Sequence, residues 1–295
     1  MDVGDLKFFA AVAKAGGMNR AARELHTVQS NVTARVRALE AELGIALFDR
    51  GHAGVTLTAA GQRLLPYAMR MVSLLEEARR AAKDDGKPKG RLTIGSIETS
   101  AALQLWPALA AYSAAYPDVD LVLRTGSTSE LTGQVLDHVI EGAFVCGPVD
   151  HEALVEEVFF HEELVVLTAR TVRSLDELIR KGDIKIIVPR PGCAYRQILE
   201  NILIKRGVVG IRCLEFGTLE AIYGSVSAGL GITLLPKSLI GSIWRDNAVG
   251  VHELREAESR VTTVFVHCRD SFISSALKEF LKFARAAPVQ MRAAE

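Results

Sequence analysis

The sequence is poor in the features that mark exported, metal-binding or membrane-spanning proteins. Only four of its 295 residues are cysteines, and they lie far apart with no CxxC pair, so reduced thiols rather than a zinc site are expected. The longest uncharged stretch, residues 99–117, contains Gln104, Pro107 and Ser113 and predicts a core helix rather than a membrane span. No basic and apolar leader opens the chain, which predicts a cytoplasmic protein with no membrane partner.

Signatures of catalysis are missing as well. The sequence contains no HExxH, GxSxG or phosphate-binding GxxxxGKS/T motif. Its Gly229-Leu230-Gly231 segment follows a predicted helix and precedes a predicted strand, which is the wrong order for dinucleotide binding. His138, His151 and His161 have no metal-ligand spacing. We therefore expect neither an enzyme nor a cofactor nor a metal site.

The chain as a whole carries no excess of either charge. It has 35 Lys and Arg residues and 35 Asp and Glu residues, and its 49% hydrophobic content excludes a disordered chain. Residues 1–90, however, hold 14 basic and 10 acidic residues, a net charge of +4, which leaves −4 for the rest. This asymmetry predicts a mildly basic, DNA-binding head on a separate, mildly acidic body.

Residues 1–57 show the pattern of a winged helix-turn-helix. A first helix is expected to stop at Gly16-Gly17, and Asn19 and Thr27 are expected to cap two further helices, over residues 20–25 and 28–42. The third helix has an apolar stripe with 4-3-4 spacing and Gly44 after its last turn: Val32, Val36, Leu39 and Leu43. Two short strands, around a glycine-rich loop at residues 50–54, then predict a hairpin wing.

A long helix is predicted from Thr58 to about Asp84. Its apolar residues follow a strict 4-3-4-3-4 spacing that is typical of a coiled-coil seam: Leu64, Ala68, Met71, Leu75, Ala78 and Ala82. We expect this seam to pair with a second copy of the chain, with Leu64, Ala68, Met71, Leu75 and Ala78 as the dimerisation residues. The alternative is one amphipathic helix packed on its own domain. Proline, glycine and alternating charges over residues 85–90 predict a hinge.

The pattern changes from Arg91 onward. Apolar strand-like runs alternate with amphipathic helical stretches over about two hundred residues, ending in a helix over residues 274–286. Such alternation is typical of an α/β domain, and it predicts a mostly parallel sheet.

Two sets of residues stand in the order and spacing of the LysR-type transcriptional regulators. The first lies in the head and comprises Ala21-Ala22, Leu25, Gln29, Val32, Leu39-Glu40, Leu43-Gly44, Leu47-Phe48, Arg50 and Leu57-Thr58-x-x-Gly61. The second lies in the body and comprises Gly142-Ala143-Phe144-Val145-x-Gly147-Pro148 and Gly229-x-Gly231-Ile232-x-Leu234-Leu235-Pro236. The chain resembles that family over nearly its whole length.

The resemblance implies an α/β fold overall with three parts. These are a mainly α winged helix-turn-helix DNA-binding domain over residues 1–58, a linker and dimerisation helix with a hinge over 59–90, and an effector-binding domain over 91–290. The last is expected to be a two-lobed α/β domain like periplasmic binding proteins, with lobe I at about 91–162 and 268–290 and lobe II at about 163–267. Implied partners are promoter DNA, further copies in a homodimer or homotetramer, a small-molecule effector and, for an activator, RNA polymerase.

The third helix of the head is the predicted DNA reader, because such helices place their N-terminal residues at base edges in the major groove. The candidate DNA-binding residues are Asn19, Gln29, Ser30, Asn31, Thr33, Arg35, Arg37, Arg50 and His52. Gln29 suits a bidentate contact to adenine, and Arg35 on the flank suits phosphate. The chain departs from the family at Ser30, where proline is usual, and at Ala34 and Ala53, where longer polar or basic side chains are common.

Polar residues at four predicted strand-to-helix corners indicate the effector site, because ligands of α/β folds bind at such corners and helix N-termini favour anions. The candidate effector-binding residues are Ser96, Glu98, Thr99, Ser100, Ser127, Thr128, Gly147, Pro148, Cys193, Tyr195, Arg196, Phe216 and Thr218. We expect a small, polar, carboxylate-bearing effector that Arg196 grips. Glu98 and Glu220 would repel such a carboxylate unless they accept hydrogen bonds from an amine or hydroxyl on the ligand.

Two other interpretations of the sequence need to be weighed, of which a redox sensor stays open and a transport component is disfavoured. A redox sensor of the same architecture would be switched by oxidation of Cys193 at a helix N-terminus, with Cys213 or Cys146 as the resolving partner. The alternative is that the Cys193 thiol is unreactive and merely lines the pocket. A solute-binding transport component would need export, which neither the missing leader nor the helix-turn-helix favours.

Overall fold

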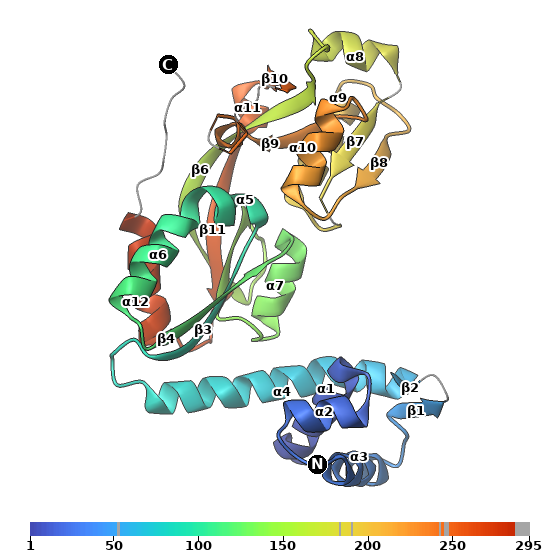
Figure 1. Ribbon diagram of the computed structural model, residues 1–295, viewed down its shortest axis with the longest axis vertical. Coiled ribbons are helices and arrows are strands. Elements are labelled where there is room, and N and C mark those ends of the chain that lie inside the picture. Colours follow the sequence, from blue (N-terminus) through green and yellow to red (C-terminus); the bar gives the residue numbers. More distant parts are fainter. Residues whose placement is uncertain (52–53, 183, 190, 242, 245–247, 287–295) are drawn as a thin grey trace. The chain divides into compact units, whose positions relative to one another are not determined.

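The computed structural model describes residues 1–51, 54–182, 184–189, 191–241, 243–244 and 248–286 (Figure 1). The chain divides into two compact units, the first comprising Met1–Asp85 and the second most residues from Gly86 onward. Within the described residues, none of the helices has the length and apolar character that a bilayer crossing needs.

The first unit is a winged helix-turn-helix. It contains α1 (Val3–Ala15), α2 (Met18–Glu24), α3 (Gln29–Leu43), the hairpin strands β1 (Phe48–Gly51) and β2 (Gly54–Leu57), and α4 (Ala59–Lys83). Glycines with positive φ end α1 and α3, as the sequence predicts. The core of this unit is formed by Leu6, Phe9, Val12, Ala21, Ala22, Val32, Val36, Leu39, Leu47, Phe48 and Ala68.

The two predicted helix caps in this unit are wrong. Asn19 lies inside α2, which begins at Met18 directly after Gly17. The residue before α3 is Val28, which has no capping side chain, because the turn closes with Thr27 donating its N–H to the Ala22 carbonyl. The Thr27 hydroxyl instead accepts a hydrogen bond from the Asn31 amide at 3.0 Å.

The long helix α4 begins with a side-chain cap and a close backbone approach. The Thr58 hydroxyl accepts from the Gly61 N–H at 3.1 Å and donates to the Ala46 carbonyl at 2.8 Å. A Cβ at Gly61 would lie 2.2 Å from the Leu47 carbonyl oxygen, so only glycine lets α4 pack this closely.

The first residues of the predicted coiled-coil seam pack against the chain's own head rather than being free to meet a second copy. Ala68 is fully buried in the head's core, and Leu64 is half-buried against it, so these two residues follow the alternative reading of a helix packed on its own domain. The large apolar side chains that α4 leaves exposed include Tyr67, Met71 and Leu74, which have heptad spacing. The exposed stripe therefore shares Met71 with the predicted seam but not Leu64 or Ala68, since the head covers that part of the helix.

The second unit is built on one long mixed sheet with the order β10–β6–β11–β5–β3–β4, and β9 also pairs with β6. The strands are β3 (Gly90–Ser96), β4 (Val119–Thr125), β5 (Gly142–Gly147), β6 (Leu154–Ala169), β9 (Thr233–Pro236), β10 (Val249–Glu253) and β11 (Arg260–Cys268). A separate parallel pair is formed by β7 (Lys185–Val188) and β8 (Arg212–Glu215). The helical segments are α5 (Glu98–Ser100), the π-helical η1 (Ala101–Leu105), α6 (Trp106–Ala115), α7 (Thr128–Leu136), α8 (Leu175–Lys181), α9 (Ala194–Lys205), α10 (Leu219–Ser227), the 3-10 turn η2 (Lys237–Leu239), α11 (Glu256–Ser259) and α12 (Ser275–Ala286).

The expectation of a mostly parallel sheet is wrong. Only β4 and β5 run parallel to β3, whereas β11 runs antiparallel to both β5 and β6, and β9 and β10 run antiparallel to β6. The long strand β6 explains this, because it runs from one lobe into the other and receives returning strands in both (Figure 1).

Lobe I contains β3, β4, β5, the first part of β6, β11 and the helices around them. Its core includes Leu92, Ile94, Tyr112, Phe144, Phe265 and Phe280, covered by α6 and α12. Because β11 pairs with β5, residues 262–266 belong to this lobe, whereas the sequence analysis placed them in lobe II. Lobe II holds β7 to β10 with α8, α9 and α10, and the Ile187 N–H donates to the Ile232 carbonyl at 2.7 Å, which joins β7 to the segment before β9.

Candidate functional site

The outward face of α3 is polar, as expected of a reading helix. Val32, Val36 and Leu39 point into the core, and the exposed residues of its first three turns include Gln29, Ser30, Asn31, Ala34, Arg35 and Arg37. Asn19 is exposed on α2. The arrangement presents amides, hydroxyls and guanidinium groups on one rigid element.

The polar side chains at the start of α3 bond to one another. The Gln29 amide donates to the Thr33 hydroxyl at 3.2 Å, and that hydroxyl donates to the Gln29 carbonyl at 3.0 Å. These bonds lie within one exposed turn, so water or a base edge can replace them at little cost. Gln29 and Thr33 are thereby aligned along the surface of the helix.

Arg35 has a partner inside the head. Its guanidinium lies 3.0 Å from the Asp5 carboxylate on α1 and 5.9 Å from the centre of the Phe8 ring. Half of the Arg35 side chain stays exposed, so a phosphate contact would have to share this group with Asp5. The geometry therefore gives Arg35 a role in fastening α3 to α1 besides any contact to DNA.

The predicted wing contacts are described only in part. The backbone of Arg50 lies in β1, paired with Val55 of β2. The side chain of Arg50 and the whole of His52 lie outside the described residues.

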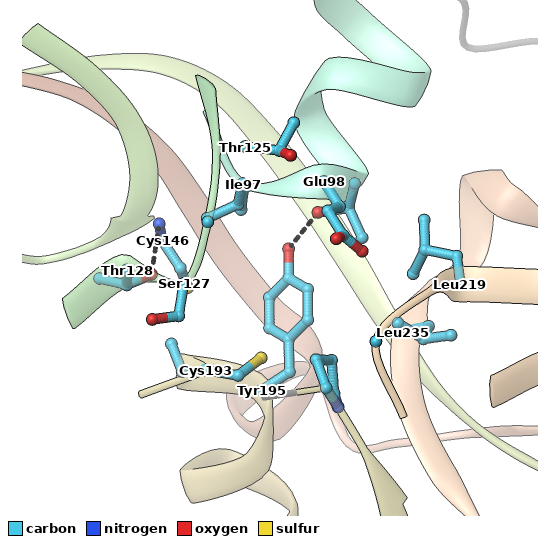
Figure 2. Close-up of a pocket in the computed structure, with 15 residues that line it drawn as sticks. Ile97, Glu98, Thr125, Ser127, Thr128, Cys146, Cys193, Tyr195, Leu219 and Leu235 are labelled. Atoms are coloured by element: carbon cyan, nitrogen blue, oxygen red, sulfur yellow. Dashed lines mark hydrogen bonds between the residues drawn. The ribbon is translucent and has the colours of Figure 1, made fainter. Parts of the chain in front are cut away.

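The second unit contains a cavity of about 110 Å³ between its two lobes (Figure 2). It is lined by Ile97, Glu98, Thr99, Thr125, Gly126, Ser127, Thr128, Cys146, Pro189, Cys193, Ala194, Tyr195, Gly217, Leu219 and Leu235. The ring of Tyr195 projects into the middle of this group, with Cys193 beside it and Glu98 near its hydroxyl end.

Six of the predicted effector-binding residues line this cavity, and they supply most of its polar side chains: Glu98, Thr99, Ser127, Thr128, Cys193 and Tyr195. The Ser127 hydroxyl accepts from the Glu130 N–H at 3.2 Å and so caps α7. The Thr128 hydroxyl accepts from the Cys146 N–H at 3.3 Å, which ties α7 to β5. Three of the four predicted corners thus contribute polar side chains to one pocket.

The other predicted residues lie around the pocket but do not line it. Ser96 and Ser100 are fully buried, where the Ser96 hydroxyl donates to the Ile97 carbonyl and the Ser100 hydroxyl lies 3.1 Å from that of Thr263. The Thr218 hydroxyl is used to cap α10. Neither Phe216 nor the cis-linked pair Gly147-Pro148 reaches the described lining, and Glu220 is exposed outside it.

Arg196, the predicted grip on a ligand carboxylate, is not among the described lining residues and is paired within its own lobe. Its Nε donates to Glu200 at 3.0 Å and its Nη1 donates to Glu215 at 2.9 Å. Both partners come from lobe II, one of them a single turn further along α9. The guanidinium is therefore satisfied within its own lobe, outside the described lining of the pocket.

The apolar side of the pocket was not predicted from the sequence. Ile97, Leu219 and Leu235 line it together with Cys146, Pro189 and Ala194. These residues look like ordinary core positions in the sequence. Thr125 was findable, because it stands beside the predicted corner residues Ser127 and Thr128, at the end of β4 where ligands bind.

The electrostatics of the pocket combine helix N-termini with one acid. The lining includes residues at the starts of α7, α9 and α10, where the positive end of a helix dipole favours an anion. Glu98 is the single charged side chain among the described lining residues. The pocket thus offers hydrogen-bond donors together with one carboxylate, that of Glu98.

The thiols of the pocket are poorly ionised. Burial raises the pKa of the Cys193 thiol above its usual value, although the backbone N–H groups of Tyr195 and Arg196 act in the opposite direction. Burial also raises the pKa of Cys146, to about 12. Neither thiol has the lowered pKa of a reactive cysteine.

Comparison with known proteins agrees with this division into a DNA-binding head and a ligand-binding body. Residues 3–62 match the bacterial regulatory helix-turn-helix protein, lysR family, and residues 85–288 match the LysR substrate binding domain. The chain is 42% identical over 288 residues to the HTH-type transcriptional regulator YofA of Bacillus velezensis, which covers 98% of this chain and 99% of that protein.

Solved structures share the fold. Full-length OxyR from Pseudomonas aeruginosa matches 98% of this chain and 99% of its own with a TM-score of 0.69 at 19% identity. CbnR complexed with its target DNA matches 97% and 99% with a TM-score of 0.66 at 23% identity. The two domain matches and the likeness to YofA show that the chain belongs to the LysR family and is a DNA-binding transcriptional regulator rather than an enzyme.

Proposed function

We propose that this regulator reads promoter DNA with α3 and that a small, polar, carboxylate-bearing effector in the pocket retunes its activity. The observation that carries the proposal is the pairing of an exposed polar helix face in one unit with a lined, hydroxyl-rich cavity in the other. Binding to promoter DNA would place the protein in the cytoplasm, and an activator would also meet RNA polymerase.

Gln29, Ser30, Asn31 and Thr33 are the proposed base-reading residues. They stand in the first two turns of α3, the part that enters the major groove in helix-turn-helix proteins. Glutamine suits adenine and the hydroxyls suit bases or phosphates. Asn19, Arg35, Arg37, Arg50 and His52 are proposed as flanking contacts that position the head on the DNA backbone.

The proposal of a carboxylate on the effector is supported by the hydroxyls and helix N-termini of the pocket, and it no longer includes Arg196. Ser127 and Thr128 stand at the start of α7, where a carboxylate gains both hydrogen bonds and the favourable end of the helix dipole. Glu98 would accept a hydrogen bond from a donor elsewhere on the same effector molecule. The apolar side chains of Ile97, Leu219 and Leu235 would hold its carbon skeleton.

Control by oxidation of Cys193 has less support. A thiol whose pKa is raised holds less thiolate at neutral pH, and thiolate is the species that reacts with oxidants. We therefore favour a bound ligand over a cysteine switch.

Pairing through α4 is proposed for the homodimer. Tyr67, Met71 and Leu74 form an exposed apolar stripe with heptad spacing, and Leu75 and Ala78 continue on the same helix. The effector domains would join such dimers into a homotetramer.

The test of the effector is a calorimetric titration of the full-length protein against a panel of small metabolites. We expect the binders to carry a carboxylate, and we expect Ser127→Ala to weaken them about 10-fold, since a hydrogen bond to a charged group contributes about 1.5–3 kcal/mol. The control is Ser113→Ala, which removes an exposed serine hydroxyl on α6. Binding of neutral apolar compounds alone would contradict the proposal.

A further inference from the structure

A cluster of buried polar side chains lies at the junction of the two lobes, directly behind the pocket. Its members share hydrogen bonds and are largely shielded from solvent: Thr99, Ser100, Gln104, Glu162, Tyr195 and Thr263. Glu162 is a carboxyl group with only 6% of its surface exposed. Burying such a group is costly unless donors surround it, so its stability depends on the hydrogen bonds of this cluster.

Tyr195 and Glu162 form the centre of this cluster. The Tyr195 hydroxyl donates to Glu162 Oε2 at 2.9 Å and lies 3.3 Å from the Thr99 hydroxyl. Glu162 Oε1 accepts from the Gln104 amide at 2.8 Å and from the Thr263 hydroxyl at 3.3 Å. The carboxylate is thus held by three donors.

The members of the cluster come unequally from the two lobes. Thr99 and Gln104 belong to the helical stretch after β3, and Thr263 and Glu162 lie on β11 and β6 where these strands pair in lobe I. Tyr195 alone comes from lobe II, in the first turn of α9. A rotation of lobe II away from lobe I would therefore withdraw one hydroxyl from both Glu162 and Thr99.

Withdrawal of that hydroxyl leaves a buried carboxyl group short of a donor. The donors matter to it, because burial raises the pKa of Glu162 while the bonds from Tyr195, Gln104 and Thr263 act in the opposite direction. A buried acceptor that loses its partner costs more than an exposed one, since no water replaces the bond.

We propose that Tyr195 and Glu162 form a latch that sets the angle between the lobes, and that a molecule in the pocket acts on this latch. Thr99 and Tyr195 both line the pocket, so an occupant contacts the latch directly. The inference goes beyond the proposed function, because it holds whatever charge the effector carries. It makes Tyr195 a positioning residue whose hydroxyl links pocket occupancy to lobe geometry.

The test is an inter-lobe distance measured by pulsed electron spin resonance on the full-length protein. Spin-labelled unnatural amino acids replace Ser113 on α6 of lobe I and Asn201 on α9 of lobe II, both exposed, and an excess of unlabelled chain suppresses distances between subunits. Wild-type protein without any ligand should give one narrow distance. Tyr195→Phe should lower the equilibrium constant between this lobe arrangement and the opened one roughly 10-fold, the change that about 1.4 kcal/mol produces, so that a second distance appears beside the first.

The matched control is Tyr112→Phe. Tyr112 is also fully buried, but its hydroxyl donates to the Ala276 carbonyl within lobe I, so the distance should not change. Thr99→Val is a second test of the latch, with a smaller shift in the same direction, and it decides the matter if Tyr195→Phe does not fold. Unchanged distances in the latch variants, or an equal change in Tyr112→Phe, would overturn the proposal. Operator binding by the same samples reports separately on the DNA-reading function.

Discussion

Arginine side chains show how far residue type alone predicts a role. Arg196 stands at a predicted ligand corner, yet it pairs with Glu200 and Glu215. The Glu200 partner could have been predicted, because it lies four residues further along the same helix. Glu215 could not, since it comes from β8 and only the folded lobe brings it near. The polar pocket residues Ser127 and Thr128 were predictable because the alternation of strand and helix patterns locates the strand-to-helix corners in the sequence.

Arg35 and Arg37 should separate stability from DNA contact. Arg35→Ala removes the ion pair with Asp5 and the contact with Phe8, so the free energy of unfolding of the head should fall by about 0.5–1 kcal/mol, the modest value of a half-exposed pair. Arg37→Ala should leave stability within about 0.5 kcal/mol and weaken binding to all DNA sequences. Thermal unfolding and DNA titrations measure both, and equal losses of stability would refute the distinction.

The Cys193 thiol should react slowly with alkylating reagents. Because burial raises its pKa, less of it is thiolate at pH 7.5 than in a free cysteine, and its alkylation by iodoacetamide should be slower than that of free cysteine and should accelerate as pH rises. Mass spectrometry of timed samples measures the rate at each cysteine. Faster alkylation than free cysteine would instead favour the oxidation switch.

At the scale of elements, periodicity predicted which segments form helices better than it predicted what they face. The predicted helix over residues 58–84 closely matches α4, but its first seam residues Leu64 and Ala68 pack into the head. Heptad spacing is the same for a face that meets its own domain and for one that meets a second chain. The antiparallel strands of the sheet escaped prediction for a similar reason, since alternation along the chain does not reveal which strand returns from the other lobe.

The exposed stripe on α4 should hold the dimer. Leu74, with 55% of its surface exposed, is the last member of the stripe, so Leu74→Asp should place a charge in the paired interface and shift the protein toward monomer. Gln62→Asp adds the same charge at an exposed position of α4 off the stripe and should leave the mass unchanged. Analytical ultracentrifugation at matched concentrations compares the two, and a dimer that survives Leu74→Asp would rule out this interface.

At the scale of the whole molecule, the sequence predicted two functional units and their order. The net charge of +4 in residues 1–90 against −4 in the remainder already separates a head from a body, and the two domain matches agree with that division. The latch was beyond prediction. Its members are spread from Thr99 to Thr263, and nothing in the sequence indicates that a glutamate, a tyrosine and a threonine from such distant segments share one hydrogen-bond network.

The most direct measurement is footprinting of the DNA upstream of this protein's own gene, at several salt concentrations, with wild-type protein and with Gln29→Ala. A paired reader should protect two half-sites about one helical turn, or a multiple of it, apart. Protection should weaken steeply as salt rises, because basic side chains release counterions from phosphate, and Gln29→Ala should lose sequence-specific protection. Protection that is absent at every salt concentration, or that Gln29→Ala and the other α3 variants leave unchanged, would contradict the account.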